Sequence, residues 1–207
     1  MPGRKLVIAV DCDDVLVQTA QNIVDNYNSL YGTSLNLGHM YKPASLDTWG
    51  TDDDDVAIER VNEFLQSDEH ARIVPDAEAV VAVRLLAERH ELHLITGRAE
   101  FLTEITKRML DDHFSGCFTS IEHTNYIVSS ASTVRRRSKG EVCQIIGADM
   151  LIDDHMEHGK NVLAADTKRV IVFGNYPWNQ EESLPEGMVR CADWAAVLEE
   201  VEQYAAR

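Results

Sequence analysis

The chain has 207 residues, of which 44% are hydrophobic and 26% charged, a composition that is typical of globular proteins and excludes disordered and fibrous classes. Its length allows one well-packed core and a small accessory unit. The net charge of -16 argues against binding a nucleic acid polymer through a broad basic surface, and no apolar run is long enough to cross a bilayer.

The N-terminal segment and the cysteines both predict a cytoplasmic protein. The apolar run Leu6 to Val10 is short and ends in an aspartate, unlike a secretory signal. The four cysteines show neither CxxC pairing nor zinc-type spacing, so we expect reduced thiols and no disulfides. We also expect no membrane partner, and the sequence leaves the oligomeric state open.

The first predicted element is a buried strand over 6–10, followed by three aspartates in four positions: Asp11, Asp13 and Asp14. On an extended strand Asp11 and Asp13 point to the same face, roughly 7 Å apart. Like charges at this distance oppose each other's ionisation. A divalent cation between them would relieve the repulsion, so the pattern suggests a metal site at the end of this strand.

A long helical insertion follows the first strand. Apolar residues at helical spacing predict two helices within 17–74 and a third, after Pro75 and Asp76, that returns the chain to the core. We therefore predict a core of residues 1–16 and 75–207 with a helical cap at 17–74. The acidic run at 51–55 is interpreted as a solvated helix start. Aromatic residues of the cap either form its small core or line a substrate slot, and Trp49 is the preferred slot candidate.

Four later runs complete the fold prediction. They are continuously apolar, as in buried parallel strands, and lie at 92–96, 150–153, 170–174 and, more weakly, 188–192. Strands that alternate with helices predict an α/β fold with a doubly wound parallel sheet. Ligands of such sheets bind at the carboxyl ends of the strands. The groups that follow those ends here are Asp11, Thr96, Asp153 and Asp154.

These groups supply what phosphoryl transfer through an aspartate requires. Asp11 could attack phosphorus, while Asp13 could protonate the leaving oxygen and later accept a proton from water. Thr96 and the amide of Gly97 could hold phosphate oxygens at a helix N-terminus. Lys139 could neutralise both the phosphate and Asp11. Together they predict an enzyme acting on a small phosphorylated substrate.

Magnesium fits the predicted carboxylate cluster, because it favours hard oxygen ligands and usually keeps several waters. Asp11, Asp154 and the backbone carbonyl of Asp13 would serve as ligands. Asp153 is then a neighbouring group or an alternate ligand. The sequence does not decide which of Asp153 and Asp154 binds the ion directly.

The stretches DCDDV, ITGR, SKGE and LIDD, in this order, resemble the four motifs of the haloacid dehalogenase superfamily of aspartate-nucleophile phosphohydrolases. The resemblance implies a Rossmann-like core, with the insertion after the first motif as a helical cap. Dehalogenase members lack the second aspartate, so Asp13 points to phosphate transfer. The implied roles are nucleophile for Asp11, acid/base for Asp13, phosphate binding for Thr96 and Lys139, and magnesium binding for Asp153 and Asp154. We further predict phosphate binding by Gly97 and Arg98 and metal binding by Asp11 and Asp13.

Within the superfamily, the chain length, the cap and the late aromatic stretch YPWN at 176–179 resemble the 5'(3')-deoxyribonucleotidase group. Thr19 departs from that group, which has an aromatic residue at this position. We therefore predict a magnesium-dependent cytoplasmic phosphomonoesterase for a (deoxy)nucleoside monophosphate. The alternatives are a phosphatase for sugar or other metabolite phosphates, a signalling protein that retains its phospho-aspartate, and a scaffold that only binds partners.

Overall fold

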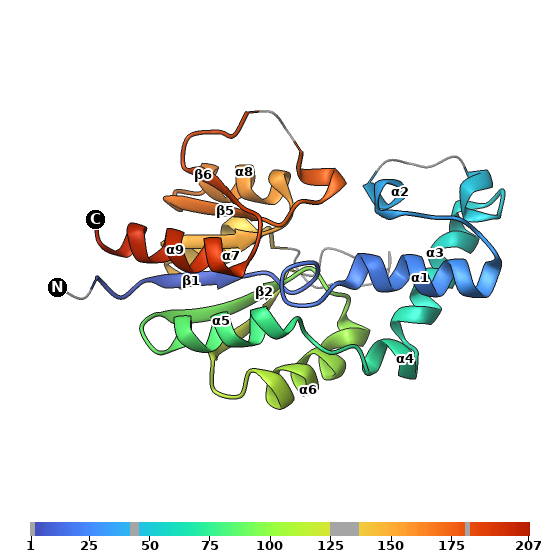
Figure 1. Cartoon of the computed structure of the whole chain (residues 1–207), viewed down its shortest axis with the longest axis horizontal. Helices are drawn as coiled ribbons and strands as arrows, with labels where there is room; N and C mark the ends of the chain where they lie inside the picture. The colour runs from blue at the N-terminus through green and yellow to red at the C-terminus, as the bar shows by residue number, and fades with distance from the viewer. Residues whose placement is uncertain (1–2, 42–45, 125–136, 181–182) are drawn as a thin grey trace.

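A six-stranded parallel sheet forms the centre of the computed structural model, which describes residues 3–41, 46–124, 137–180 and 183–207 (Figure 1). The strand order is β3-β2-β1-β4-β5-β6, so β1 and β4 lie in the middle. Every pairing is parallel. The strands are β1 (Val7–Val10), β2 (Glu91–Thr96), β3 (Phe118–His123), β4 (Met150–Asp153), β5 (Arg169–Phe173) and β6 (Met188–Cys191).

Helices cover both faces of this sheet. Successive side chains of β1 point to opposite faces and enter two different apolar clusters. Ile8 and Val10 pack with residues of α5, α6 and α9, whereas Ala9 packs with residues of α7 and α8. The arrangement confirms the predicted doubly wound α/β fold. The covering helices are α5 (Ala77–Ala87), α6 (Thr103–His113), α7 (Lys139–Ile146), α8 (Met156–Ala164) and α9 (Trp194–Ala205).

The strand β3 was not predicted. It lies at the edge of the sheet and pairs only with β2 among the described strands. Its residues are mostly half-buried, and Ser120 and Glu122 interrupt the apolar residues. An edge strand of this kind lacks the continuous apolar run by which the other strands were recognised.

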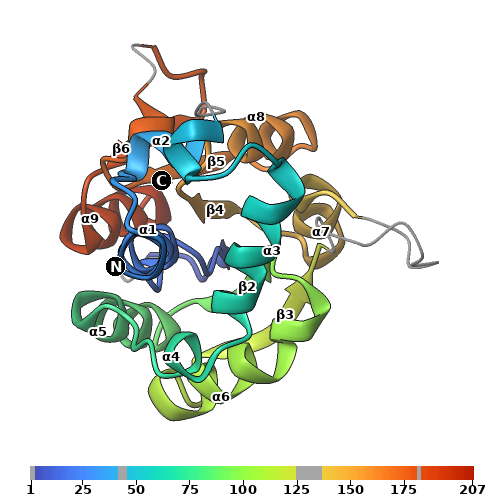
Figure 2. The same cartoon turned by 90° about the vertical axis from the view of Figure 1, so that its right-hand side faces the viewer.

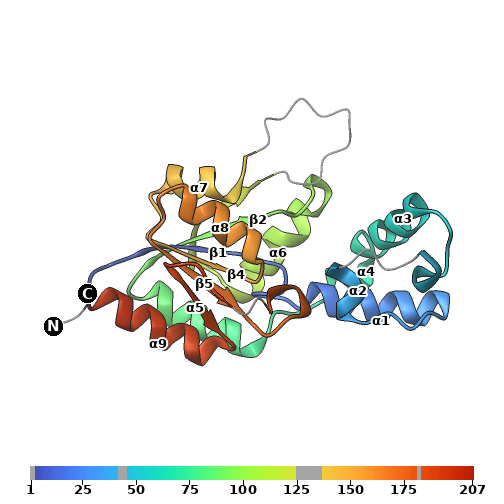
Figure 3. The same ribbon diagram turned by 90° about the horizontal axis from the view of Figure 1, so that it is seen from above.

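A separate set of helices lies beyond the carboxyl ends of the strands and is called here the helical group (Figures 2 and 3). It has its own small core, in which Val24, Tyr27 and Leu35 are buried. The exposed acidic run begins α3, with Asp53 as its N-cap, as predicted. The division of the chain into two domains stays a prediction. The group comprises α1 (Thr19–Tyr31), α2 (Leu37–Tyr41), η1 (Leu46–Trp49), α3 (Asp54–Leu65) and α4 (Asp68–Ala71).

Two short 3-10 helices complete the surroundings of the strand ends. The helix η2 (Glu100–Leu102) follows β2, and η3 (Pro177–Asn179) follows β5. The helical group contacts the rest of the molecule at η3 through α2. No helix in the described ranges has both the length and the apolar character needed to span a membrane.

Candidate active site

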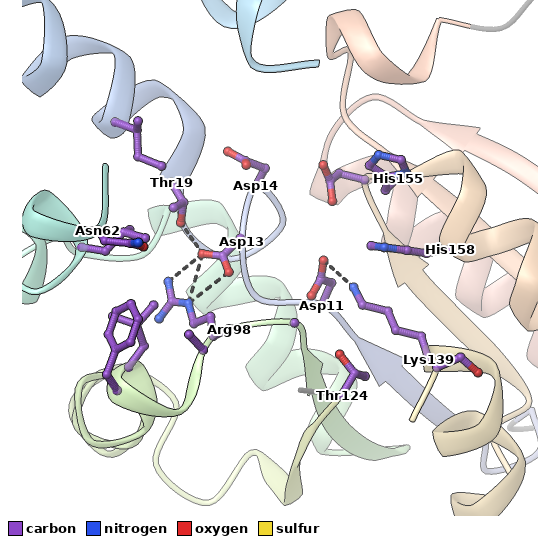
Figure 4. Close-up of a pocket in the computed structure, with 18 of the residues that line it drawn as sticks. Asp11, Asp13, Asp14, Thr19, Asn62, Arg98, Thr124, Lys139, His155 and His158 are labelled. Carbon is purple, nitrogen blue, oxygen red and sulfur yellow. Dashed lines mark hydrogen bonds and ion pairs between the residues drawn. The ribbon is translucent and has the colours of Figure 1, made fainter. Parts of the chain in front are cut away.

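A cavity of about 310 Å³ lies at the carboxyl edge of the sheet and is lined by residues of both the sheet layer and the helical group (Figure 4). Its volume is in the range of small-molecule sites. The strand ends and the loops after them supply most of its charged groups. These are Asp11, Asp13, Asp14, Arg98, Lys139, Asp154, His155 and His158.

The Lys139 cluster consists of Asp11, Lys139, Asp153 and His158. The ammonium of Lys139 lies 2.7 Å from Asp11 Oδ2 and 2.6 Å from Asp153 Oδ2. The other oxygen of Asp153 lies 3.2 Å from His158 Nδ1. The three charged residues are buried, so their charges are held close together with little water to screen them.

Local structure fixes Lys139 at the start of α7. Ser138 is the N-cap, and its hydroxyl accepts a hydrogen bond from the Glu141 amide, while the Glu141 carboxylate accepts one from the Ser138 amide. The next residue, Gly140, packs against α8 so closely that a Cβ there would lie 2.9 Å from the Asn161 carbonyl oxygen. This capping box and close helix packing direct Lys139 toward β1 and β4.

Burial and neighbouring charges shift the pKa values of both carboxylates in the Lys139 cluster. Burial raises the pKa of Asp11 to about 6, with a contribution from Asp153 that Lys139 partly offsets. Burial also favours the protonated form of Asp153, but Lys139 and His158 outweigh it and lower its pKa. Asp11 is therefore ionised at neutral pH and held less firmly in that form than Asp153.

The Arg98 cluster consists of Asp13, Thr19, Arg98 and Thr106. Arg98 donates to Asp13 through Nε (3.0 Å) and Nη2 (2.8 Å), and to the Thr106 hydroxyl through Nη1 (3.0 Å). The Thr19 hydroxyl also donates to Asp13 (Figure 4). Burial favours protonated Asp13, but the Arg98 ion pair outweighs it and lowers the pKa.

Asp14 adds a further carboxylate to the cavity, for which the sequence reasoning gave no role. Its φ of 58° is in the left-handed region, which aspartate tolerates better than most residues. The side chain accepts a hydrogen bond from the Ala20 amide at the start of α1. Burial raises its pKa to about 7, and the charges of Asp13 and Asp11 add to the shift.

Asp154 is held by the aromatic stretch at 176–179. Trp178 Nε1 donates to Asp154 Oδ2 at 2.6 Å, and Asn179 Nδ2 donates to the Asp154 carbonyl at 3.0 Å. Tyr176 stacks on Trp178 with the ring centroids 4.7 Å apart. Burial, together with Asp153 and Asp11, raises the pKa of Asp154 well above its ordinary value. This loop therefore fixes the position of a carboxylate at the cavity.

Comparisons with known proteins add the fold relationship. No family model and no curated protein matches the sequence. A haloacid dehalogenase-like hydrolase from Streptococcus pneumoniae has a similar structure, with a TM-score of 0.66 at 12% identity over 95% of this chain and 98% of that one. The chain has the haloacid dehalogenase-like (HAD) fold.

Two further solved structures show that this fold does not determine which reaction a protein catalyses. The YfnB protein of Bacillus subtilis, solved with magnesium bound, matches with a TM-score of 0.62 at 12% identity over 98% of this chain and 99% of that one. The L-2-haloacid dehalogenase of Xanthobacter autotrophicus matches with a TM-score of 0.60 at 8% identity over 95% and 98%. The HAD fold hosts different reactions, so the reaction must be argued from site residues. The comparisons give no support to the narrower nucleotidase resemblance.

The donor set of this site fits a divalent cation. Ligand atoms of Asp11, Asp153 and His158 lie within 4.8 Å of one another. Around the cavity, the carboxylates Asp11, Asp13, Asp14, Asp153 and Asp154 outnumber the Lys139 and Arg98 cations by five to two. Burial, together with the neighbouring aspartates, raises the pKa values of Asp11 and Asp154, and added positive charge would favour their ionised forms.

The predicted metal ligands do not all lie together. Asp11 and Asp153 belong to the group of close ligand atoms, whereas the described contact of the Asp154 carboxylate is with Trp178. The carboxylate of Asp13 is paired with Arg98, while its backbone carbonyl, the ligand atom predicted from the sequence, stays a prediction. The sequence reasoning missed His158. Its signal was its position four residues after Asp154, which puts it on the first turn of the helix after β4.

The predicted phosphate-binding residues also differ in their positions relative to the cavity. Gly97 and Lys139 line the cavity. Thr96 is fully buried at the end of β2 outside the described cavity lining, and its hydroxyl accepts a hydrogen bond from the Arg98 amide. Arg98 lines the cavity, but its guanidinium holds Asp13 and Thr106, so its described contacts differ from the predicted role.

The structure does not bring Trp49 to the cavity. Its ring lies edge-on to Tyr27 with centroids 5.0 Å apart, and its carbonyl accepts a hydrogen bond from the Tyr27 hydroxyl. Trp49 thus packs with the small core of the helical group. The sequence reasoning gave core packing the greater weight for any one aromatic residue of the cap, and named Trp49 as the candidate for a substrate contact. Aromatic spacing on a helix does not show which side the ring faces.

Proposed function

We propose that this protein is a magnesium-dependent phosphomonoesterase that acts through a phosphorylated Asp11. The observation that carries the proposal is the placement of two carboxylates with different environments in one cavity. Asp11 is ionised beside Lys139, as a nucleophile must be. Asp13 lines the same cavity and is available as a proton carrier.

In the first half of the proposed reaction, an oxygen of Asp11 attacks phosphorus, and the leaving oxygen departs with a proton from Asp13. The Lys139 ammonium and the Gly97 amide offset the charge of the phosphoryl oxygens. A bound divalent cation supplies further charge neutralisation. Because Arg98 favours ionised Asp13, the first half requires that the negative charge of the bound substrate raises the pKa of Asp13 enough for it to carry a proton.

In the second half, water attacks the phosphorus of phospho-Asp11 and Asp13 accepts its proton. Inorganic phosphate leaves, and the Asp11 carboxylate is restored. The ion pair with Arg98 suits this half, because it keeps Asp13 in the form that accepts a proton. Asp13 therefore distinguishes a hydrolase from a protein that retains its phospho-aspartate.

We propose a small phosphorylated metabolite as substrate. A nucleoside monophosphate is the first candidate on the resemblance of the sequence, and a sugar phosphate is the alternative. The cavity volume of about 310 Å³ is consistent with either class.

Release of inorganic phosphate from a library of monophosphates, with and without Mg²⁺, tests this function. We expect magnesium-dependent release by the native protein and its loss in Asp11→Asn. Asp111→Asn, at an exposed position of α6, is the matched control and should retain activity. Undiminished activity of Asp11→Asn would refute the assignment of Asp11 as the nucleophile. A phosphorylated Asp11 that persists without phosphate release would instead favour the signalling alternative.

A further inference from the structure

The cavity has two walls of different chemistry. Lys139, His155 and His158 lie on one side of Asp11, whereas Thr19 and Asn62 lie on the other side, near Asp13 and Arg98 (Figure 4). The first wall holds the charges that suit a phosphoryl group. A leaving group attached to that phosphoryl group would therefore extend toward the second wall.

The second wall is mostly apolar. The helices α1, α3 and η2 contribute six described residues to the cavity, and two of these, Thr19 and Asn62, are polar. The apolar ones are Ile23, Leu65, Phe101 and Leu102. Phe101 is 44% exposed although its neighbour Leu102 is buried, so an aromatic ring is offered to whatever occupies the cavity.

The charges around the cavity disfavour a leaving group that carries a second anion. Arg98 and Lys139 are the lysine and arginine residues among the described lining residues. Arg98 is paired with Asp13, and Lys139 with Asp11 and Asp153. A second phosphate or a carboxylate would meet the surplus of aspartates without an uncommitted guanidinium or ammonium group among the described lining residues.

The polar groups of the second wall disfavour a leaving group with many hydroxyls. The hydroxyl of Thr19 already donates to Asp13. The side-chain amide of Asn62 is left as a donor and acceptor on this wall. Hydroxyl groups that lose water against apolar side chains without new partners cost binding energy.

We propose that the cavity selects phosphomonoesters whose leaving group contains an uncharged, planar ring, with Phe101 as the main specificity residue and Asn62 contacting the edge of the ring. The inference rests on the proposed function, and it names the substrate class as nucleoside and aryl monophosphates. It favours these over sugar monophosphates and bisphosphates. Stacking on an aromatic side chain and burial of apolar surface provide the selectivity.

Steady-state kinetics with Mg²⁺ on two variants test the proposal. Phe101→Ala removes the aromatic ring from the cavity. Ile58→Ala is the matched control, because Ile58 is 57% exposed on α3 but does not line the cavity. The substrates are a nucleoside 5'-monophosphate, an aryl phosphate, a hexose 6-phosphate and acetyl phosphate, whose small leaving group has no ring to stack on Phe101.

We expect the native protein to prefer the nucleoside and aryl phosphates over the hexose phosphate. Phe101→Ala should lower kcat/KM for these two substrates by about tenfold, the discrimination expected for an apolar contact. It should leave acetyl phosphate turnover within about twofold, since that substrate does not stack on the ring. Ile58→Ala should change neither value.

Preference of the native protein for the hexose phosphate, or an equal loss on all substrates in Phe101→Ala, would overturn the proposal. Failure to hydrolyse acetyl phosphate would count against the proposed function instead. Calorimetry of Asp11→Asn with the nucleoside monophosphate and the hexose phosphate then decides the binding preference without turnover. Equal affinity for the two ligands would overturn the selectivity.

Discussion

The Lys139 cluster and the Arg98 cluster are each built around an aspartate at the end of β1, but they tie that aspartate to different parts of the molecule. The Lys139 cluster joins β1, β4, α7 and α8, all of which belong to the sheet and its covering helices. The Arg98 cluster joins the loops after β1 and β2 to α6 and to Thr19 at the start of the helical group.

This difference gives the two aspartates opposite pKa shifts. The pKa of Asp11 is raised by burial, while that of Asp13 is lowered because the Arg98 pair outweighs burial. Two identical side chains two residues apart can thus serve as nucleophile and proton carrier, with the surroundings assigning the roles.

The sharpest test of this comparison is to remove each carboxylate separately. Asp11→Asn should lose the activity by about 10⁴-fold or more, because the residual rate lacks the nucleophile. Asp13→Asn should lose about 10²- to 10⁴-fold, the usual contribution of general acid and base catalysis. With acetyl phosphate, Asp13→Asn should also accumulate a phosphorylated protein, detectable by intact-protein mass spectrometry, which Asp11→Asn cannot form. Phosphorylated Asp11→Asn would contradict the assignment.

Breaking the ion pair of the Arg98 cluster should destabilise the protein. Arg98→Gln leaves Asp13, which is partly buried, without its buried guanidinium partner and should lower the free energy of unfolding by about 2 kcal/mol, less than for fully buried pairs. Arg4→Gln is the control, because its pair with Asp149 has a similar length of 2.9 Å but is exposed, and should cost less than about 1 kcal/mol. Urea denaturation measures both. Equal losses of unfolding free energy in the two variants would show that the Arg98–Asp13 pair stabilises the protein no more than the exposed pair.

The hydrogen bond from Trp178 to Asp154 should affect metal affinity. Trp178→Phe keeps an aromatic ring for stacking on Tyr176 but removes the Nε1 donor, and should weaken Mg²⁺ binding by about tenfold. Calorimetry measures the affinity. Trp194→Phe is the control, since Trp194 lies under the sheet in the core. An unchanged Mg²⁺ affinity in Trp178→Phe would contradict a role of Asp154 in the metal site.

The pH dependence of magnesium stabilisation should follow the raised pKa values at the cavity. The pKa of Asp11 is about 6 and that of Asp14 about 7, against an ordinary value of 3.8. In the metal-free protein, ionising these groups lowers stability as the pH rises from about 4 to about 7, because the folded state holds protons that the unfolded chain has released.

We expect Mg²⁺ to bind the ionised carboxylates, so the stabilisation that it provides should increase as the pH rises. At about five times its dissociation constant, Mg²⁺ should raise the free energy of unfolding by about 1 kcal/mol at pH 8. At pH 5, the same concentration should have much less effect, because Asp11 is largely protonated there. Thermal unfolding at both pH values, with and without Mg²⁺, measures the difference. An effect of the same size at pH 5 and pH 8 would argue against Asp11 as a ligand.

The sequence predicted those features that depend on one segment at a time. Buried strands and the aspartate that follows β1 are marked by apolar runs and by their immediate neighbours, as for Val10 and Asp11. The edge strand β3 was missed because its half-buried residues carry no such run. Trp49 was given a substrate contact because spacing alone does not show whether an aromatic ring faces a cavity or a core.

Contacts between distant segments were harder to predict. Arg98 is 85 residues from Asp13 in the chain, and its guanidinium geometry toward that carboxylate depends on how the loops after β1 and β2 meet. The same holds for Trp178 and Asp154, which are 24 residues apart. His158 and Asp14 had no assigned role because their significance comes from the charges gathered around them in three dimensions.

The central position of β1 in the sheet has a consequence for local unfolding. Its residues Ile8, Ala9 and Val10 are completely buried and pair with β2 on one side and β4 on the other. Backbone amides in such a strand exchange with deuterium only when the whole domain opens, whereas those of the helical group exchange through smaller fluctuations. We therefore expect Asp11, the proposed nucleophile, to follow the most slowly exchanging part of the chain, while Thr19, Ile23, Asn62 and Leu65 of the opposite wall lie on helices that exchange faster.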